Sequence, residues 1–333
     1  VGGTATCATE SAVPDPTNKP PCLRDVREFG ASGDGRTLDT KAIQAAIDVA
    51  AGHGGGVLLR GGTFLSGSIR LRSNVVLCVE PGSVLLGSPR IGDYPEWPST
   101  YPCRSSDHYT RRSLIFAEKA ENVSLSGGGI IDGQGRSPTF QEPCRRAEAE
   151  RPLLLRFSEC RNVRVSGITL RDSAMWVQSY LACEGVHVDG INVSSRANSN
   201  NDGLDIDDCT NVRIINSDIW SGDDAICLKS TSRRRCRNVV IANCHLSSRA
   251  NALKMGTDST GGFDNVVITN CTIRDTNLAG ITLQCVDGGT LERVLVSNIV
   301  MDNVGCAVFV RLGNRGRGME RPEPGRLRRV IIS

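Results

Sequence analysis

Aromatic residues and long apolar runs are both scarce in this chain of 333 residues. Phe, Trp and Tyr make up only 4% of it, whereas it holds 36 glycines and 39% apolar residues. This composition argues against a large helical core and favours many turns around small or β-branched core residues. No apolar run approaches the roughly 18 residues that span a bilayer, so we expect no membrane segment. The first residue is Val1 rather than Met, so any targeting segment has been removed or left out.

Lysine is scarce as well, and positive charge is carried by arginine. Only five of the 39 basic residues are lysines, which leaves 39 − 5 = 34 arginines, and the net charge of +3 is too small to indicate nucleic-acid binding. Arginines gather at 233–235 and between Arg311 and Arg329. These clusters fit either an anionic polymer held through carboxylate contacts or an ordinary solvated surface.

A short phrase, in which a small polar residue precedes Val and alternating apolar residues, recurs along the chain. It stands at Asn122, Asn162, Gly185, Asn211, Asn238, Asn265 and Arg293, and from Asn162 onward the intervals are 23, 26, 27, 27 and 28 residues. One such unit cannot bury its apolar face alone, but stacked units share a continuous core. We therefore predict an all-β fold, a single parallel β-helix over residues 23–333, after an irregular segment at 1–22.

The two ends of such a cylinder need covers. The stretch LDTKAIQAAIDVAA predicts an amphipathic helix with Ile43, Ala46, Ile47 and Ala50 on one face and Asp39 or Thr40 as N-cap, which would plug the N-terminal end. At the other end RRVIIS starts a further phrase and stops. The chain is therefore expected to end short of its natural cap.

Fourteen cysteines favour an oxidised, exported protein, yet six of them follow the repeat. In register, the six form two ladders that we interpret as small buried residues rather than disulfides, made of Cys160, Cys183, Cys209 and Cys236, and of Cys244 and Cys271. Cys7 with Cys22, and Cys103 with Cys144, are the better candidates for disulfide bridges.

Aspartates concentrate in NNDGLDIDDC and in SGDDAICLKS. The repeat places Asp202 on one coil and Asp223 with Asp224 on the next, about 4.8 Å away. Like charges this close split the pKa values of an acid and a base, as hydrolysis of a glycosidic bond requires; carboxyl groups roughly 6.5 to 9.5 Å apart are typical of the inverting mechanism.

Each of these aspartates also has an ordinary structural interpretation. Asp pairs in β-helix turns commonly cap backbone amides or face solvent, and we expect this of Asp205, Asp207 and Asp208. The spacing and the terminal Glu of a calcium-binding EF-hand are missing, so we expect no metal site and no cofactor.

The opening segment from about residue 22 and the two aspartate motifs together resemble family 28 of the glycoside hydrolases, the polygalacturonases and rhamnogalacturonan hydrolases, which are pectin-lyase-like right-handed parallel β-helices. The resemblance covers nearly the whole chain. It implies that Asp223, in an intact Gly-Asp-Asp motif, is the general acid and that Asp202 and Asp224 hold the attacking water. In the motif before Asp202, Asn201 replaces the family's Thr. Trp176 either borders the cleft or packs in the core or rim.

Two cationic motifs of the polygalacturonases are missing. Asn251 stands where their histidine would be, and Thr282 and Gln284 stand where an Arg and a Lys would grip the galacturonate carboxylate. Each lost charge-assisted contact is worth about 1.5 to 3 kcal/mol. His245 is expected to be structural rather than a replacement. The remaining candidate substrate contacts are, besides Asn251 and Gln284, Lys229, Arg249, Lys254 and Arg311; an alternative role for Lys229 is to fix the aspartates as an ion pair.

The sequence thus predicts a secreted or periplasmic, inverting glycoside hydrolase of a pectic polysaccharide or oligosaccharide, more rhamnogalacturonan-like or modified than plain polygalacturonate. Two alternatives stay open: a calcium-dependent polysaccharide lyase on the same fold with Lys254 or Arg249 as base, and a non-catalytic glycan-binding β-helix. No nucleic-acid or membrane partner is expected, and the sequence leaves the oligomeric state open.

Overall fold

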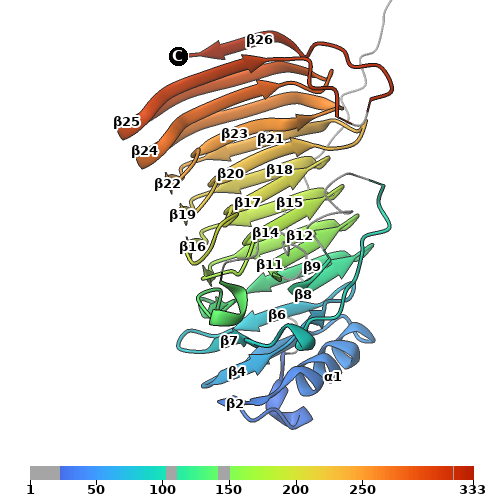
Figure 1. The fold of residues 1–333 in the computed structure, drawn as a ribbon. Coiled ribbons are helices and arrows are strands. Elements are labelled where there is room, and N and C mark those ends of the chain that lie inside the picture. Colours follow the sequence, from blue (N-terminus) through green and yellow to red (C-terminus); the bar gives the residue numbers. More distant parts are fainter. Residues whose placement is uncertain (1–22, 103–110, 142–150, 318) are drawn as a thin grey trace, which may run out of the picture.

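The chain winds into a single right-handed parallel β-helix, as a computed structural model shows (Figure 1). The structure describes residues 23–102, 111–141, 151–317 and 319–333. All strand pairs given by the register are parallel, and strands in the middle of the cylinder pair with the strand one coil earlier and one coil later. The two expected disulfides, Cys7 with Cys22 and Cys103 with Cys144, lie outside the described residues.

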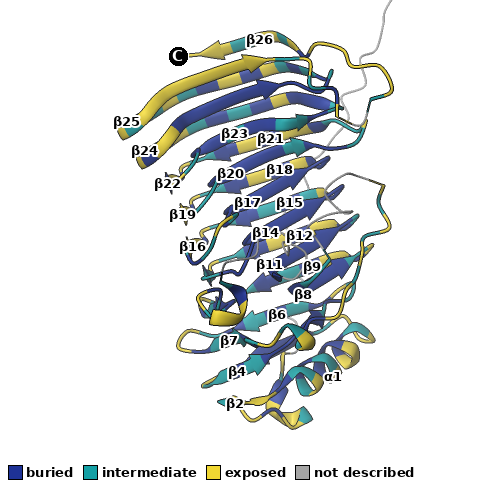
Figure 2. Cartoon of the chain, viewed as in Figure 1, coloured by how far each residue is buried: buried dark blue, intermediate teal, exposed yellow. Residues whose placement is uncertain are grey.

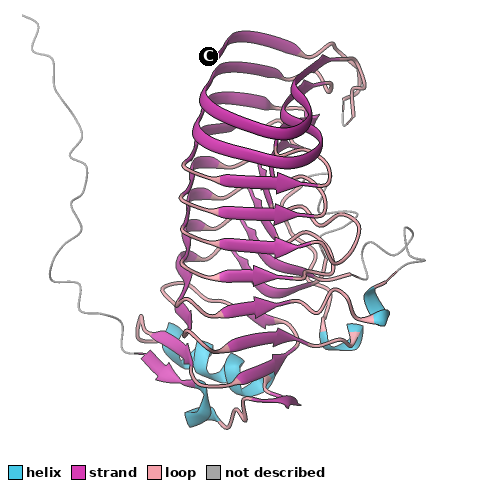
Figure 3. Cartoon of the chain, turned by 90° about the vertical axis from the view of Figure 1, so that its left-hand side faces the viewer, coloured by secondary structure: helices cyan, strands magenta, loops and turns pink. Residues whose placement is uncertain are grey.

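The strands form three stacks along the cylinder (Figure 3). The first stack, which carries the repeat phrase, contains β1 (Leu23–Asp25), β3 (Gly56–Leu59), β6 (Val76–Val79), β9 (Glu121–Ser126), β12 (Arg161–Ser166), β15 (Glu184–Asp189), β18 (Thr210–Ile215), β21 (Cys236–Ala242) and β26 (Arg326–Ile332). The second contains β2 (Asp34–Leu38), β4 (Thr63–Ser66), β7 (Val84–Gly87), β10 (Ile130–Asp132), β13 (Thr169–Arg171), β16 (Asn192–Ser195), β19 (Asp218–Ser221) and β22 (His245–Ser248). The third contains β5 (Ile69–Arg70), β8 (Ser113–Glu118), β11 (Leu153–Ser158), β14 (Gln178–Leu181), β17 (Leu204–Asp207), β20 (Ile226–Ser230) and β23 (Leu253–Ser259). The long strands β24 (Gly262–Cys285) and β25 (Thr290–Leu312) run through all three stacks.

The inward-facing residues of successive coils, as far as Val296 on β25, form one apolar core (Figure 2). In the first stack Val163, Val186, Val212, Val239 and Val266 lie in register and are almost completely buried. Alternation of period 2 directs these side chains inward and their neighbours outward. This explains why the repeat phrase predicts the fold.

Asparagines stack at the turn that begins each phrase. Asn122, Asn162, Asn211, Asn238 and Asn265 all have a φ between 53 and 60°. Asn is one of the few residues that adopt this left-handed conformation readily. The amide of Asn265 donates to Asn238 and that of Asn238 to Asn211, at 3.0 and 2.9 Å. The ladder fixes each coil directly over the one before it.

The helix α1 (Thr40–Ala51) covers the N-terminal end of the cylinder, as predicted, with Ile43, Ala46, Ile47 and Ala50 buried. Asp39 occupies the N-cap position, but its carboxylate makes no capping bond to the helix. It accepts instead from the backbone N–H groups of Ser32 and Gly33 at 2.7 and 3.0 Å. Its role is therefore to fasten the preceding turn. The described residues also contain three short 3₁₀-helices, Val26–Phe29, Ile91–Asp93 and Pro138–Phe140.

The two cysteine ladders are confirmed. All ten cysteines in the described ranges are free, and the six that follow the repeat are buried. The Cys183 N–H lies 3.3 Å from the Cys209 sulfur on the next coil. These residues pack as small apolar side chains inside the cylinder. No helix in the described ranges is long and apolar enough to cross a membrane.

Candidate active site

Three carboxyl groups meet where the chain passes from the second stack into the third. The backbone N–H of Gly203 donates to the Asp224 carbonyl, and that of Ala225 donates to the Asn251 carbonyl, so Asp202, Asp224 and Asn251 lie on consecutive coils. One carboxylate oxygen from each of Asp202, Asp223 and Asp224 lies within 4.8 Å of the others. The structure therefore brings together the three predicted catalytic residues.

The turn before Asp202 is held by Asn201, which is completely buried. Its side-chain oxygen accepts from the N–H groups of Ala197 and Asn198, and its amide donates to the carbonyls of Ser173 and Met175. These four contacts use both ends of the side-chain amide, which the hydroxyl of the family's Thr could not match. Asn201 thus holds the turn that carries Asp202, and all of these contacts are to backbone groups.

Asp224 is the most firmly held of the three carboxylates. Its Oδ1 accepts from the Asn251 side chain at 2.7 Å and from the Asn251 N–H at 3.2 Å, and its Oδ2 lies 2.6 Å from the Lys254 ammonium. The Thr282 hydroxyl in turn donates to the Asn251 oxygen at 2.9 Å. Asn251 and Lys254, which the sequence offered as substrate contacts, are therefore placed against this carboxylate.

Lys229 links Asp202 to a second, unexpected carboxylate. Its ammonium lies 2.7 Å from Asp205 and 3.7 Å from Asp202, and 3.9 Å from the centre of the Trp176 ring. The expectation that Asp205 faces solvent is wrong, because its residue is only 1% exposed. Burial by itself would lower the pKa of Lys229. The negative charge of Asp205, together with other nearby groups including Asp202, has the larger effect and raises this pKa well above its usual value. Lys229 is thus a charged ion-pair partner, and Trp176 is a buried packing residue beneath it.

The two other aspartates of this run are also buried, but they bind backbone amides as expected. Asp207 accepts from the Thr231 N–H and hydroxyl at 3.0 and 2.7 Å. Asp208 accepts from the Ser232 N–H at 3.1 Å. Both therefore fasten the turn that follows β20.

Asp223 differs from its neighbours in exposure and in contacts. It is partly exposed, its Oδ1 accepts from the Asp224 N–H at 2.9 Å, and its backbone carbonyl is held by the hydroxyls of Ser221 and Ser248. Burial and then the neighbouring Asp224 raise the pKa of Asp223. Burial and Asp205 also raise the pKa of Asp202, and burial raises that of Asp205 to about 6 against the effect of Lys229.

Proton occupancy follows from the charges. The four aspartates of this cluster and the two lysines would together carry a net charge of −2 if every group were ionised. Such a charge in a poorly solvated site is costly, so at least one carboxyl group retains a proton near neutral pH. Lys229 or Lys254 lies within 3.7 Å of Asp202, Asp205 and Asp224, whereas Asp223 forms no ion pair with the described residues and burial raises its pKa, so Asp223 is best placed to carry that proton.

Gln284 and Arg311, two further candidate substrate contacts, lie on the third stack. Lys254 is in register with Cys227 and Thr282, and Gln284 with Arg311. Gln284 is nearly buried, whereas Arg311 and Arg249 are exposed. His245 is the first residue of β22, outside the catalytic cluster, as its early strand position indicated.

The three carboxylates are close enough to hold a metal ion. However, the ammonium groups of Lys229 and Lys254 already lie beside two of them. A divalent cation would have to share the site with two fixed positive charges, which disfavours its binding.

The comparisons with known proteins agree with this architecture. The model of the glycosyl hydrolases of family 28 matches residues 99–312, more than half of the chain. A probable polygalacturonase of Vitis vinifera is 34% identical over 217 residues, which are 61% of this chain and 43% of that protein. The chain spans about half or less of the length of the curated relatives it matches.

Solved structures show the same fold. The polygalacturonase of Erwinia carotovora ssp. carotovora superimposes with a TM-score of 0.75 at 20% identity, over 98% of this chain and 96% of that one. The exopolygalacturonase of Thermotoga maritima gives 0.74 at 24% identity, over 88% and 77%. With the family match over residues 99–312, these findings establish that the chain belongs to family 28 of the glycosyl hydrolases.

Proposed function

We propose that this protein hydrolyses glycosidic bonds of a pectic polysaccharide with inversion at the anomeric carbon. The observation that carries the proposal is the convergence of Asp202, Asp223 and Asp224 within 4.8 Å, with unequal contacts. Asp223 is the proton donor, because it is partly exposed, has a raised pKa and has no ammonium at contact distance in the described chain.

In the proposed reaction Asp223 protonates the oxygen of the scissile bond as the bond to the anomeric carbon breaks. A water molecule held by Asp202 and Asp224 attacks that carbon from the opposite face and gives its proton to one of these two carboxylates. The products are a sugar with a new reducing end and the shortened chain with a free hydroxyl.

The contacts of Asp224 argue against a covalent intermediate. Both of its oxygens are engaged, one by Asn251 and the other by Lys254. Such a carboxylate is a stabilised anion and a poor nucleophile toward carbon. The oxygen separations of up to 4.8 Å are shorter than the roughly 6.5 to 9.5 Å between carboxyl groups that is typical of inverting enzymes, so the inverting mechanism rests on these contacts and on the family resemblance rather than on spacing.

The substrate is proposed to be a pectic chain that is modified or of the rhamnogalacturonan type. Relatives are named polygalacturonases and exopolygalacturonases, which supports a pectic polymer. In this chain the uncharged Thr282 and Gln284 occupy the places of the carboxylate-binding Arg and Lys, and Thr282 is already bonded to Asn251. Arg311, in register with Gln284 and about 4.8 Å further along the stack, supplies one cation at the far side of the site. Because such polymers lie outside the cytoplasm, we place the protein's action in the extracellular space or the periplasm.

Elimination by a lysine base is disfavoured by the same contacts. Burial would lower the pKa of Lys254, but the nearby Cys227 and Asp224, whose carboxylate lies 2.6 Å away, raise it above the usual value, so this side chain is protonated and unable to accept a proton. A new ultraviolet absorbance of an unsaturated product that disappears with chelator would instead support the lyase.

The decisive experiment compares the wild type with Asp223→Asn on purified pectic fractions. Reducing ends measure turnover, and NMR of the first product formed gives its anomer. The variant is expected to lose hydrolysis while its circular dichroism and unfolding midpoint stay unchanged. An unchanged rate in the variant, or a first product that keeps the anomeric configuration, would remove the proposed mechanism. Binding without turnover on every fraction would point to a glycan-binding protein.

A further inference from the structure

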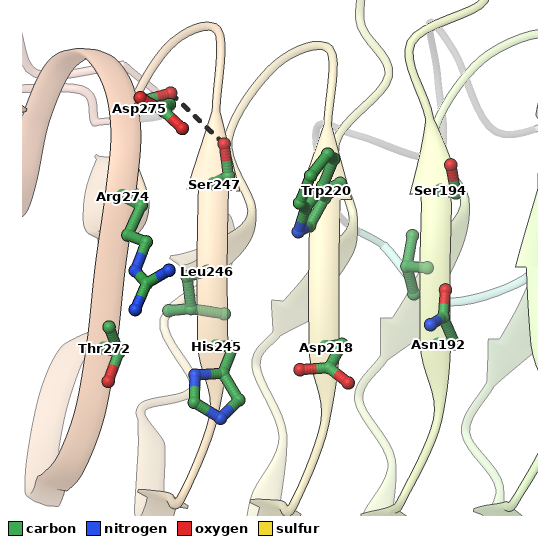
Figure 4. A pocket seen from close by; sticks show the side chains of 11 residues that line it. Asn192, Ser194, Asp218, Trp220, His245, Leu246, Ser247, Thr272, Arg274 and Asp275 are labelled. Atoms are coloured by element: carbon green, nitrogen blue, oxygen red, sulfur yellow. Dashed lines mark hydrogen bonds between the residues drawn. The ribbon is translucent and has the colours of Figure 1, made fainter. Parts of the chain in front are cut away.

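A pocket of about 630 Å³ lies on the outer face of the second stack, across β16, β19, β22 and β24 (Figure 4). Its lining contains none of Asp202, Asp223 and Asp224, which lie where the chain passes from the second stack into the third. Its centre is Trp220, which is 55% exposed, whereas the other two tryptophans, Trp97 and Trp176, are partly or fully buried. An indole left in water on a flat sheet exposes apolar surface that a ligand would cover.

The side chains around Trp220 form two parallel rows. Ser194, Trp220 and Ser247 are in register on adjacent strands, so the indole stands between two small residues and is not covered by its neighbours along the row. The next row, two residues away, is polar and contains Asn192, Asp218, His245 and Thr272. A flat aromatic surface beside a row of hydrogen-bonding groups fits a pyranose ring, whose C–H face packs on the indole while its hydroxyls meet the polar row.

Two guanidinium groups border this surface. Arg196 lies with its Cζ 5.6 Å from the centre of the Trp220 ring and donates to the Ser247 hydroxyl at 2.7 Å. Arg274 is exposed, forms no ion pair with the described residues, and points toward the strand of His245 in Figure 4. The free guanidinium offers two parallel donors for a sugar carboxylate.

The two carboxylates that line the pocket, Asp218 and Asp275, are compatible with a sugar ligand. Asp275 accepts a hydrogen bond from the Asn303 side-chain amide at 2.7 Å, so one of its two carboxylate oxygens is already engaged. Asp218 lies in the polar row, opposite His245 and away from the row of Ser247. Carboxylates in these positions can accept hydrogen bonds from sugar hydroxyls while Arg274 takes the acidic group.

The pocket also adjoins the catalytic turn. Trp220 precedes Asp223 by only three residues, and β19 leads directly into the Gly222–Asp224 turn. Arg196 donates to the Ser221 carbonyl at this corner of the cylinder, and the exposed Arg249 lies near it. A basic corner therefore connects the two faces.

We propose that the Trp220 pocket is a second carbohydrate-binding site, which takes a uronic-acid residue of the polysaccharide outside the cleavage site. The identity of the polymer rests on the proposed function, whereas the existence of the site rests on Trp220 and Arg274. Binding here holds a long chain on the enzyme between cleavage events and leaves the chemistry at Asp223 unaltered.

The test measures binding without turnover, in the Asp223→Asn background. Retardation in gels containing polygalacturonate, or the same polymer fully methyl-esterified, gives apparent affinities. Trp220→Ala is expected to weaken binding of both polymers about tenfold, as loss of an aromatic anchor does, and Trp220→Phe should restore most of it. Arg274→Gln should weaken binding of polygalacturonate only, because esterification removes the charge that Arg274 recognises. The matched control is Val240→Ala, at a position on the first stack that is 36% exposed.

A second readout follows the indole itself. Polygalacturonate should protect the protein's tryptophan fluorescence from acrylamide, and this protection should be lost in Trp220→Ala. Equal affinities of Trp220→Ala and Val240→Ala would overturn the site, and an equal effect of Arg274→Gln on both polymers would overturn its acidic ligand. Because neither readout needs hydrolysis, Trp220-dependent binding by a wild type that cleaves no pectic fraction would refute the proposed function alone.

Discussion

The ion pair between Lys254 and Asp224 gives the sharpest prediction of stability. The Lys254 side chain is 19% exposed and that of Asp224 only 3%, and their charged atoms lie 2.6 Å apart. At an effective dielectric constant of ~20 two unit charges at that distance attract by ~6 kcal/mol, and the cost of desolvating both groups offsets much of it. Removal of one partner of a buried pair typically costs ~3–5 kcal/mol because the other charge stays buried and unpaired. Since the ammonium keeps some contact with water, Lys254→Met should lose about 3 kcal/mol of the free energy of unfolding.

Urea unfolding of the single and double variants separates lost packing from the stranded charge. Asp224→Asn added to Lys254→Met removes that charge and keeps an oxygen that accepts from Asn251, so the double variant should be more stable than Lys254→Met, yet inactive. Arg72→Met is the control, because the Arg72–Asp48 pair lies at a similar 2.9 Å with both side chains nearly half exposed, and such pairs contribute little. A loss below about 1 kcal/mol in Lys254→Met, or a double variant no more stable than the single one, would refute the reasoning.

Three other outcomes are expected. Because burial and Asp224 raise the pKa of Asp223, and because the acid must be protonated to react, kcat/KM should fall as pH rises through this raised value; an alkaline limb at the ordinary Asp value of about 3.9 would contradict the assignment. Chelator should leave the rate unchanged, because Lys229 and Lys254 supply the positive charge beside the carboxylates, and loss of activity that calcium restores would point to a metal enzyme. Ile47→Ala in the capping helix should cost about 2–5 kcal/mol in thermal or urea unfolding, since Ile47 is fully buried, whereas Val49→Ala on the exposed side of the helix should cost far less; equal losses would show that the helix does not seal the core.

The coiled architecture was predictable because each coil repeats one local pattern. The phrase at Asn211, Asn238 and Asn265 fixes both the inward valines and the left-handed turn before them. Once the repeat length is known, counting residues from one phrase to the next places Asp202 and Asp224 on neighbouring coils. The hydrogen bond from the Gly203 N–H to the Asp224 carbonyl confirms this placement. The helix over Thr40–Ala51 followed from its apolar face in the same way.

Contacts between side chains were less predictable, because they depend on rotamers and burial that periodicity does not specify. Asp205 faces away from the core and was therefore expected in solvent, but Lys229 on the adjacent strand neutralises it and allows it to be buried. The positively charged Lys229 on the next coil was the sequence feature that could have predicted the burial of Asp205. Asp39 was likewise assigned to the helix from its position, while its carboxylate binds the turn before it. Asn251 matched a family histidine in register, but only the structure showed that its amide holds Asp224.

The stacking of coils has a consequence for how such a protein can vary. Asp202, Asp224 and Asn251 belong to three successive coils whose separations are set by the hydrogen bonds between those coils alone. Insertion or loss of whole coils elsewhere would lengthen or shorten the cylinder without moving these groups relative to one another. The length of polymer that the protein can contact and the reaction at the site can thus evolve separately. The first changes with the number of coils, and the second changes with single substitutions around the three carboxylates.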